Sequence, residues 1–388
     1  MKTKRTRAVA PIDLVGSWQG STDAATPYLA DRGEEFLPMR IALDAMGGDH
    51  APAPIVTGAV EAVREQLDLT VVLVGDQARI EAALAEHPDA PLDRLPIVHA
   101  SQVIEMGEKP VEALRRKRDN SISRSWALMA SGEVSSVVSA GSTGAMVASA
   151  LVNGKLFLPG VRRPGIAAIF PSHKGPIVLL DVGANMGAKP EDLYQYGVMG
   201  SVYAETILGI ADPKIGILNV GSEDDKGNDL TRAVRALYID SPLSSRFAGF
   251  IEGRDLYEGN ARVVVCEGFV GNVVLKAGEG AVEFLFSMLK EQMGGLLPKL
   301  GAELGGMVGG GLKALKSRFE YEEFGGAPLL GIRGSCIICH GSSKARAIKN
   351  ALRVGGAMAD DRLGDRIVKE LAQAPGTTAG LNAAGTLA

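Results

Sequence analysis

Glycine turns that carry polar residues are the first feature of this sequence that could do chemistry. The apolar run Ile41–Ala45 is followed by Gly47 and Gly48, and Asp49 and His50 come next. Glycine permits a positive φ and a close approach of the backbone, and the start of a helix presents free N–H groups. Strand, turn and helix start would together bind an anion. A tight turn that binds nothing is the alternative interpretation.

Six turns of this kind occur in the chain, each directly after an apolar run. The carboxyl ends of the strands in an open α/β sheet form its ligand crevice, so we expect the six turns to form one ligand-binding rim. Glycines that serve only the packing of helices on strands are the alternative. The turns are Asp44–Asp49, Ala140–Gly144, Asp181–Gly187, Asn219–Gly227, Glu267–Asn272 and His340–Ser343.

Two lysines and an asparagine in these turns or directly after them suit the binding of an anion or an oxyanion. Lys189 stands at a predicted helix start, where the helix dipole and the ammonium would both attract an anion. Asn185 can donate to a carbonyl or an oxyanion. Lys226 is a second cation in a glycine turn. A solvated lysine at a helix start is the simpler interpretation of Lys189 taken alone.

Three further signals are weaker. Cys336 and Cys339 have the CxxC spacing of haem attachment and of redox sites, but they lie in an apolar run, and we expect buried thiols. His340 and His50 are either hydrogen-bonded structural residues or groups for acid–base chemistry. The basic run Arg115–Arg118 is either a solvated helix end or a contact for an acidic partner.

Composition and periodicity predict the elements that position these residues. Of 388 residues, 46% are hydrophobic and only 5% aromatic, which is typical of α/β sheets buried on both faces. The net charge of −4 argues against nucleic acid, the three cysteines suit a reducing compartment, and no span reads as transmembrane. Apolar runs alternate with helical patterns from Met39 onward, which predicts an α/β fold with a mostly parallel sheet between two helical layers. The expected strands are 41–45, 70–75, 95–100, 134–140, 165–170, 177–181, 214–220, 249–252, 262–266 and 335–339, and the expected helices are 76–86, 110–119, 122–131, 189–208, 229–239, 270–293, 312–318 and 343–352, besides one that starts near Pro52.

The chain divides into one large unit with two flanking segments. Residues 1–38 are polar and aperiodic, and we expect a disordered extension, with Met39 as a possible start of the natural protein. We expect residues 39–372 to form a single two-lobed catalytic unit and residues 373–388 to form a disordered tail. Within the unit, residues 284–319 are predicted to be a glycine-rich apolar surface insertion.

The insertion combines bulky apolar residues with many glycines and flanking lysines. Glycine destabilises a helix by about 1 kcal/mol relative to alanine, so a packed core is a poor place for this segment. Apolar residues beside basic ones suit an anionic lipid surface or an acyl chain, and a dimer interface is the alternative. The expected membrane or acyl-chain contacts are Leu296, Leu297, Leu300, Leu312 and Leu315.

The turns also resemble, in order, the signature motifs of the phosphate acyltransferases of bacterial phospholipid synthesis (acyl-ACP:phosphate transacylases, the PlsX family). Four residues depart from the family pattern: Ser142 stands where Asn is usual, Gly187 where Asp is frequent, and Cys266-Glu267 where Thr-Asp is frequent. The matching motifs are Asp44–Pro52, Ser139–Ala145, Asp181–Asn185 with Lys189-Pro190, Leu218–Gly221 with Lys226-Gly227, Glu267–Asn272, Gly325–Gly331 and His340–Ser343.

This resemblance implies a fold of the isocitrate/isopropylmalate dehydrogenase type, commonly dimeric. The implied reaction moves a long-chain fatty acyl group from acyl carrier protein to inorganic phosphate and gives acyl phosphate for phosphatidic acid and phospholipid synthesis. The implied location is the cytoplasm, with peripheral association to an anionic membrane. A phosphotransacylase that uses acyl-CoA, a nicotinamide-dependent hydroxy-acid dehydrogenase of the same fold, and a non-catalytic membrane-surface adaptor are the alternatives.

For the implied reaction the protein must position phosphate and stabilise an oxyanion. We expect Lys189 to contact phosphate or the oxyanion, Asn185 to donate to the oxyanion, and His340 or His50 to protonate the leaving thiolate. Asp44 and Asp181 are expected to order their loops, and neither a metal nor a cofactor is required. The residues expected to bind substrate or phosphate, or to build that site, are Asp44, Gly47, Gly48, His50, Ser142, Thr143, Asp181, Gly183, Lys226 and Asn272.

Overall fold

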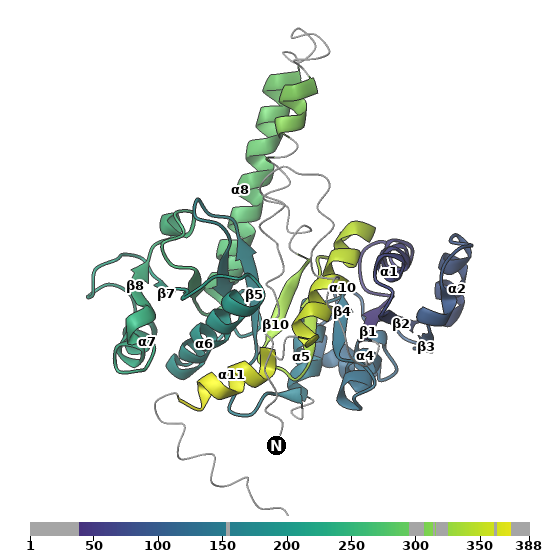
Figure 1. Ribbon diagram of the computed structural model, residues 1–388, viewed down its shortest axis with the longest axis horizontal. Coiled ribbons are helices and arrows are strands. Elements are labelled where there is room, and N and C mark those ends of the chain that lie inside the picture. The colour runs from purple at the N-terminus through teal and green to yellow at the C-terminus, as the bar shows by residue number, and fades with distance from the viewer. Residues whose placement is uncertain are drawn as a thin grey trace, which may run out of the picture.

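The computed structural model describes residues 39–152, 156–294, 306–312, 315, 325–360 and 363–373. Within these ranges eleven strands form one sheet in the order β3-β2-β1-β4-β11-β10-β5-β6-β9-β7-β8 (Figure 1). The strands are β1 (Met39–Asp44), β2 (Leu69–Gly75), β3 (Ile97–His99), β4 (Ser136–Ser139), β5 (Gly165–Phe170), β6 (Ile177–Leu180), β7 (Ile215–Leu218), β8 (Phe247–Ile251), β9 (Val263–Val265), β10 (Ala327–Leu330) and β11 (Ser335–Ile338).

Helices cover both faces of this sheet, as the apolar periodicity predicts. Side chains alternate along β1, so that Ile41 and Leu43 face one core and Ala42 faces the other. Helices α1, α2, α6, α7, α10 and α11 contribute to the first core, and α3, α4 and α5 to the second. The helices are α1 (Ala53–Glu65), α2 (Gln77–Ala85), α3 (Pro110–Arg116), α4 (Ser121–Ala130), α5 (Thr143–Val152), α6 (Pro190–Thr206), α7 (Asp229–Ile239), α8 (Gly268–Gly294), α10 (Ala345–Asp360) and α11 (Leu363–Leu371).

The expected α/β class and mostly parallel sheet are confirmed, and most expected elements are present within a few residues of their predicted ends. The sequence analysis missed strand β10 and helix α11, and it ended α10 eight residues early. β10 is short, and its glycine-flanked residues belong to a motif that we interpreted only as a signature. α11 packs its apolar face on α6, a contact that no local pattern specifies.

The strand directions contradict the expectation that all six turns form one rim along a parallel sheet. β10 pairs antiparallel with both β11 and β5, and β5 pairs antiparallel with β6. The strands β6, β9, β7 and β8 therefore run in the opposite sense along the sheet to β1, β4 and β11. The six turns consequently do not follow one edge of a parallel sheet, and the sheet has two halves with separate sets of turns.

The segment that we expected to reach a membrane begins on α8. Figure 1 shows this long helix standing away from the body of the molecule. Its bulky apolar side chains are exposed, with Phe284 at 66%, Leu285 at 54% and Met288 at 45%. Leu296, Leu297 and Leu300, the extension 1–38 and most of the tail lie outside the described residues. No described helix is both long and apolar enough to cross a membrane.

Candidate functional site

The turns after β1, β4 and β11 pack together around a buried aspartate. Asp44 is 1% exposed, and its Oδ2 accepts a hydrogen bond from Ser139 Oγ at 2.7 Å. Its Oδ1 accepts from the Met46 N–H at 3.2 Å, and Ser139 Oγ in turn accepts from the Gly141 N–H at 3.0 Å. Burial raises the pKa of Asp44, and these hydrogen bonds oppose that effect. The aspartate thus fixes the β1 and β4 turns, as expected.

Glycines let these three turns approach one another closely. A Cβ on Gly47 would come within 2.5 Å of the Gly141 nitrogen, and Gly48 has a φ of 110°, which L side chains rarely adopt. The Asp49 N–H donates to the Gly341 carbonyl at 2.8 Å, which joins the β1 turn to the β11 turn. We call this assembly of the β1, β4 and β11 turns the first network.

The first network presents polar side chains beside the start of α5. Ser142 is 6% exposed, and its Oγ accepts from the Ala145 N–H at 3.4 Å, so this serine caps the start of α5. Thr143 and His50 are exposed. The Ser342 N–H donates to Nδ1 of the exposed His340 at 3.3 Å, and Ser342 Oγ lies 2.7 Å from that nitrogen. In its neutral form His340 therefore carries its proton on Nε2.

The turn after β6 is built around a second buried aspartate. Asp181 is fully buried, and its Oδ1 accepts from the N–H groups of Ile166, Gly183 and Ala184 at 2.9–3.0 Å. Its Oδ2 accepts from the N–H of Asn185 at 2.7 Å. Burial raises the pKa of Asp181, while the backbone N–H groups oppose that effect. The N–H of Gly183, which we expected to bind phosphate, is thus used by an internal carboxylate.

The structure contradicts the expected role of Asn185 as an oxyanion donor, because both N–H groups of its amide are used inside the protein. The side chain is 2% exposed, and Nδ2 donates to the Pro164 carbonyl at 2.7 Å, to Tyr196 Oη at 2.8 Å and to Asp181 Oδ2 at 3.3 Å. Its Oδ1 lies 3.4 Å from Nη1 of Arg163. Asn185 is therefore a positioning residue that ties the β6 turn to β5 and α6.

The start of α8 packs directly on the β6 turn. The Gly268 N–H donates to the Asn185 carbonyl at 3.0 Å. A Cβ on Gly271 would come within 1.9 Å of the Asp181 carbonyl oxygen, so only glycine fits there. Asn272 is half-buried, and its side chain lies beside Gly183. We call this assembly of the β6 and β9 turns the second network.

Lys189 lies at the edge of the second network, at the start of α6. Its N–H donates to Asp192 Oδ2 at 2.8 Å, and the buried Asp192 also accepts from Arg162 Nε at 3.0 Å, which fixes the helix start. The Lys189 side chain is exposed, and its ammonium has no ion-pair partner among the described residues. Lys226 is likewise exposed, in the separate turn after β7, and its side chain packs over Gly221.

The two networks lie in different halves of the sheet and share no hydrogen bond among the described residues. The sequence analysis found the turns themselves but missed Arg163 and Tyr196, which hold Asn185. Tyr196 lies in α6 and Arg163 just before β5, and neither has a local motif. Their contact with the turn exists only after β5, β6 and α6 have packed together.

The cysteines behave as buried thiols. Cys336 and Cys339 are 0% and 5% exposed, and Cys266 is 3% exposed, with its thiol 3.3 Å from the Asp181 carbonyl. Burial raises the pKa of Cys339 to about 12 and raises that of the other two as well. Within the described residues no three His, Cys, Asp or Glu side chains gather as a metal site would require.

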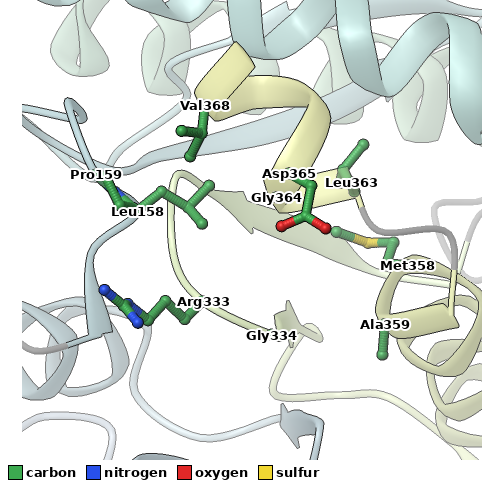
Figure 2. A pocket seen from close by; sticks show the side chains of 10 residues that line it. All are labelled: Leu158, Pro159, Arg333, Gly334, Met358, Ala359, Leu363, Gly364, Asp365 and Val368. Carbon is green, nitrogen blue, oxygen red and sulfur yellow. The ribbon is translucent and has the colours of Figure 1, made fainter. Parts of the chain in front are cut away.

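A pocket of about 540 Å³ lies away from both networks, where α10 ends and α11 begins (Figure 2). Arg333 and Gly334 line it just before β11 starts, whereas His340 follows the end of that strand. The remaining lining comes from the loop at Leu158, from the end of α10 and from α11, including Asp365. None of the residues that we expected to bind substrate lies in this pocket.

Comparison with known proteins supports the resemblance in the motifs. A family model described as a fatty acid synthesis protein matches residues 39–366. A phosphate acyltransferase of Heliobacterium modesticaldum is 51% identical over 317 residues, which cover 81% of this chain and 92% of that protein. A phosphate acyltransferase of Pelotomaculum thermopropionicum is 50% identical over 326 residues, covering 84% of this chain and 93% of that protein.

The solved structures are more distant. The EutD phosphotransacetylase from Staphylococcus aureus superposes with a TM-score of 0.52 at 16% sequence identity, covering 83% of this chain and 94% of that one. At this identity the likeness shows a shared fold.

Proposed function

Because the chain belongs to the phosphate acyltransferase family and is an acyltransferase, we propose that it transfers a long-chain fatty acyl group from acyl carrier protein to inorganic phosphate. The observation that carries this proposal is the identity of about half the residues over more than four-fifths of the chain. This proposal goes beyond the family in two respects. It makes acyl carrier protein the donor, and it places the acyl phosphate in phosphatidic acid and phospholipid synthesis. The dehydrogenase and adaptor alternatives are set aside because the family is one of acyltransferases.

The proposed reaction needs an oriented nucleophile and a stabilised oxyanion rather than a strong base. A phosphate oxygen forms a bond to the thioester carbonyl carbon, and the carbonyl oxygen becomes an oxyanion. When that intermediate collapses, the C–S bond breaks and the thiolate takes up a proton. Phosphate is already anionic near neutral pH, so positioning and electrostatic stabilisation supply most of the rate.

We assign the roles to groups whose hydrogen-bonding or ion-pairing capacity is unused among the described residues. The Lys189 ammonium holds phosphate, with Lys226 as a second cation. The first network contributes the Gly48 N–H, the Thr143 hydroxyl at the start of α5, and His340, which in its imidazolium form gives its Nε2 proton to the thiolate and is left as the neutral imidazole. Asp44, Asp181 and Asn185 hold these groups in place through buried hydrogen bonds. The reaction centre in this proposal lies between the two halves of the sheet.

The test is the incubation of the protein with palmitoyl-ACP and phosphate, followed by detection of acyl phosphate. The variant Lys189→Ala should lower kcat/KM by roughly 10²–10³-fold, because it removes a charge-assisted contact to the reacting phosphate. Lys369→Ala, which removes another exposed lysine on α11, serves as the control and should leave turnover unchanged. Wild-type turnover in Lys189→Ala would refute its role, and turnover with palmitoyl-CoA but not palmitoyl-ACP would establish the alternative donor.

We also propose that the protein is a homodimer that associates peripherally with an anionic membrane through the segment 284–319. The exposed side chains of Phe284, Leu285 and Met288 support this proposal, because an apolar face of that size is rarely left in water. A long-chain acyl phosphate is poorly soluble, so release at a lipid surface suits the chemistry.

Replacement of Leu296, Leu297 and Leu300 by Gln should release the protein from vesicles of anionic phospholipid while soluble turnover persists. Leu67→Gln is a matched control, because Leu67 is 81% exposed on the body of the molecule. If the triple variant still sediments with vesicles, or if it becomes monomeric instead, the segment is not the membrane contact.

A further inference from the structure

A loop and a short helix cover the outer side of the first network. Pro110, at the start of α3, lies over the start of α5, where a Cβ on Gly144 would come within 2.6 Å of its Cγ. Met106 lies over the β11 turn, 3.2 Å from a Cβ placed on Gly341. α3 also packs along α5. The segment 105–118 is therefore the surface that a partner would meet next to the proposed reaction centre.

This surface is basic in a protein whose net charge is −4. Between Glu105 and Arg124 there are six basic and four acidic residues. Glu108 binds two of the basic side chains, Arg116 at 3.0 Å and Lys117 at 2.5 Å, and Asp119 binds Arg124 at 2.6 Å.

Two guanidinium groups are left over. Arg115 and Arg118 are exposed and have no ion-pair partner among the described residues. A structural role at the end of the helix accounts for one of them at most. Basic residues in a last turn are favoured by the helix dipole, which suits Arg115. Arg118 lies beyond the end of α3 at Arg116 and gains little from the dipole.

Apolar side chains accompany these charges. Met106 and Val111 are 51% and 52% exposed on the same segment. Apolar contacts with a rim of charges are typical of a protein–protein interface, in which the charges steer the encounter and the apolar groups hold it. A small phosphorylated ligand would not need the apolar contacts.

We propose that Met106, Val111, Arg115 and Arg118 form the docking surface for an acidic protein, namely the carrier that delivers the acyl thioester. This inference rests on the proposed function, because that function makes the donor a protein. The complementary charge of the two surfaces would raise the rate of association and place the thioester beside the start of α5.

The test compares the variant Arg115→Glu/Arg118→Glu with wild type on two donors, palmitoyl-ACP and the neutral thioester octanoyl-N-acetylcysteamine. With palmitoyl-ACP we expect KM to rise about tenfold or more, with kcat nearly unchanged, and the dependence of kcat/KM on salt to flatten. Kinetics with the neutral thioester should not change. The control is Arg64→Glu, because Arg64 is an exposed arginine at the end of α1, on the opposite face of the sheet.

Direct binding of the unacylated carrier to wild type and variant, measured by calorimetry, separates this inference from the proposed function. Binding to wild type that is lost in the variant supports the docking surface, whichever thioester is turned over. Absence of binding to wild type, equal binding to both proteins, or equal losses with both thioesters would overturn it. Turnover of the neutral thioester alone, with binding intact, would contradict the proposed donor and not the surface.

Discussion

Replacement of Asp181 by Asn tests whether an internal carboxylate organises the second network. Asp181 is the only acceptor that the structure gives to the N–H groups of Gly183, Ala184 and Asn185 within the described residues. An amide can turn its oxygen toward the three N–H groups that now bind Oδ1. Its NH2 group then faces the N–H and Nδ2 of Asn185, where donor meets donor.

The magnitude follows from two buried donors without an acceptor: the Asn185 N–H, which loses Oδ2, and the new amide NH2 group that faces it. Nδ2 of Asn185 keeps the Pro164 carbonyl and Tyr196 Oη as acceptors. A buried donor left without a partner costs roughly 1–3 kcal/mol, so two of them cost about 2–6 kcal/mol. Burial raises the pKa of Asp181 because it disfavours the charged carboxylate. A neutral amide does not carry this cost, which offsets part of the loss of stability. We therefore expect the free energy of unfolding to fall by about 2–4 kcal/mol, a large part of the 5–15 kcal/mol that is typical of a folded domain.

The assay is urea unfolding of wild type, Asp181→Asn and Asp44→Asn. Asp44 is equally buried, but one of its partners is the Ser139 hydroxyl, which can rotate to accept from the new amide. Asp44→Asn should therefore destabilise the protein less than Asp181→Asn does. Turnover should fall in Asp181→Asn, because the β6 turn leads into the start of α6 at Lys189. Equal stability of Asp181→Asn and wild type would refute the role of the carboxylate.

Two further outcomes are expected. The double variant Cys336→Ser/Cys339→Ser should lower the free energy of unfolding by about 1–3 kcal/mol for each buried hydroxyl without a partner, with little effect on kcat. Lost turnover at unchanged stability would show instead that the thiols are catalytic. The pKa of Asp44 is raised above its ordinary value of 3.8, so the folded state binds a proton at this carboxyl more tightly than the unfolded state does. The resulting contribution to stability is present at low pH and is lost as pH rises through the raised pKa. Denaturant titrations from pH 3.5 upward should show that the free energy of unfolding of the wild type falls with pH, by at most about 1.4 kcal/mol per pH unit, and that this fall is absent in Asp44→Asn. Parallel pH profiles of the two proteins would contradict the predicted direction.

Local patterns predicted most of the elements and the turns because they depend on near neighbours along the chain. The apolar run before Gly47 becomes β1, and the expected helix 229–239 has the bounds of α7. The sequence also predicted that Asp44 and Asp181 order loops, since a carboxylate beside phosphate would repel it. The turn motifs predicted the family, and the relatives that are about 50% identical confirm it.

The sequence by itself determined the alternation of strands and helices, the glycine turns and the family to which they belong. Only the tertiary structure decided how the turns are grouped, because strand direction depends on the pairing of β10 with β11 and β5, which are distant in the sequence. It also decided that Asn185 points inward and Lys189 outward. A side chain is available to a substrate only if its hydrogen-bonding capacity is unused after folding, and the partners of Asn185 come from β5 and α6.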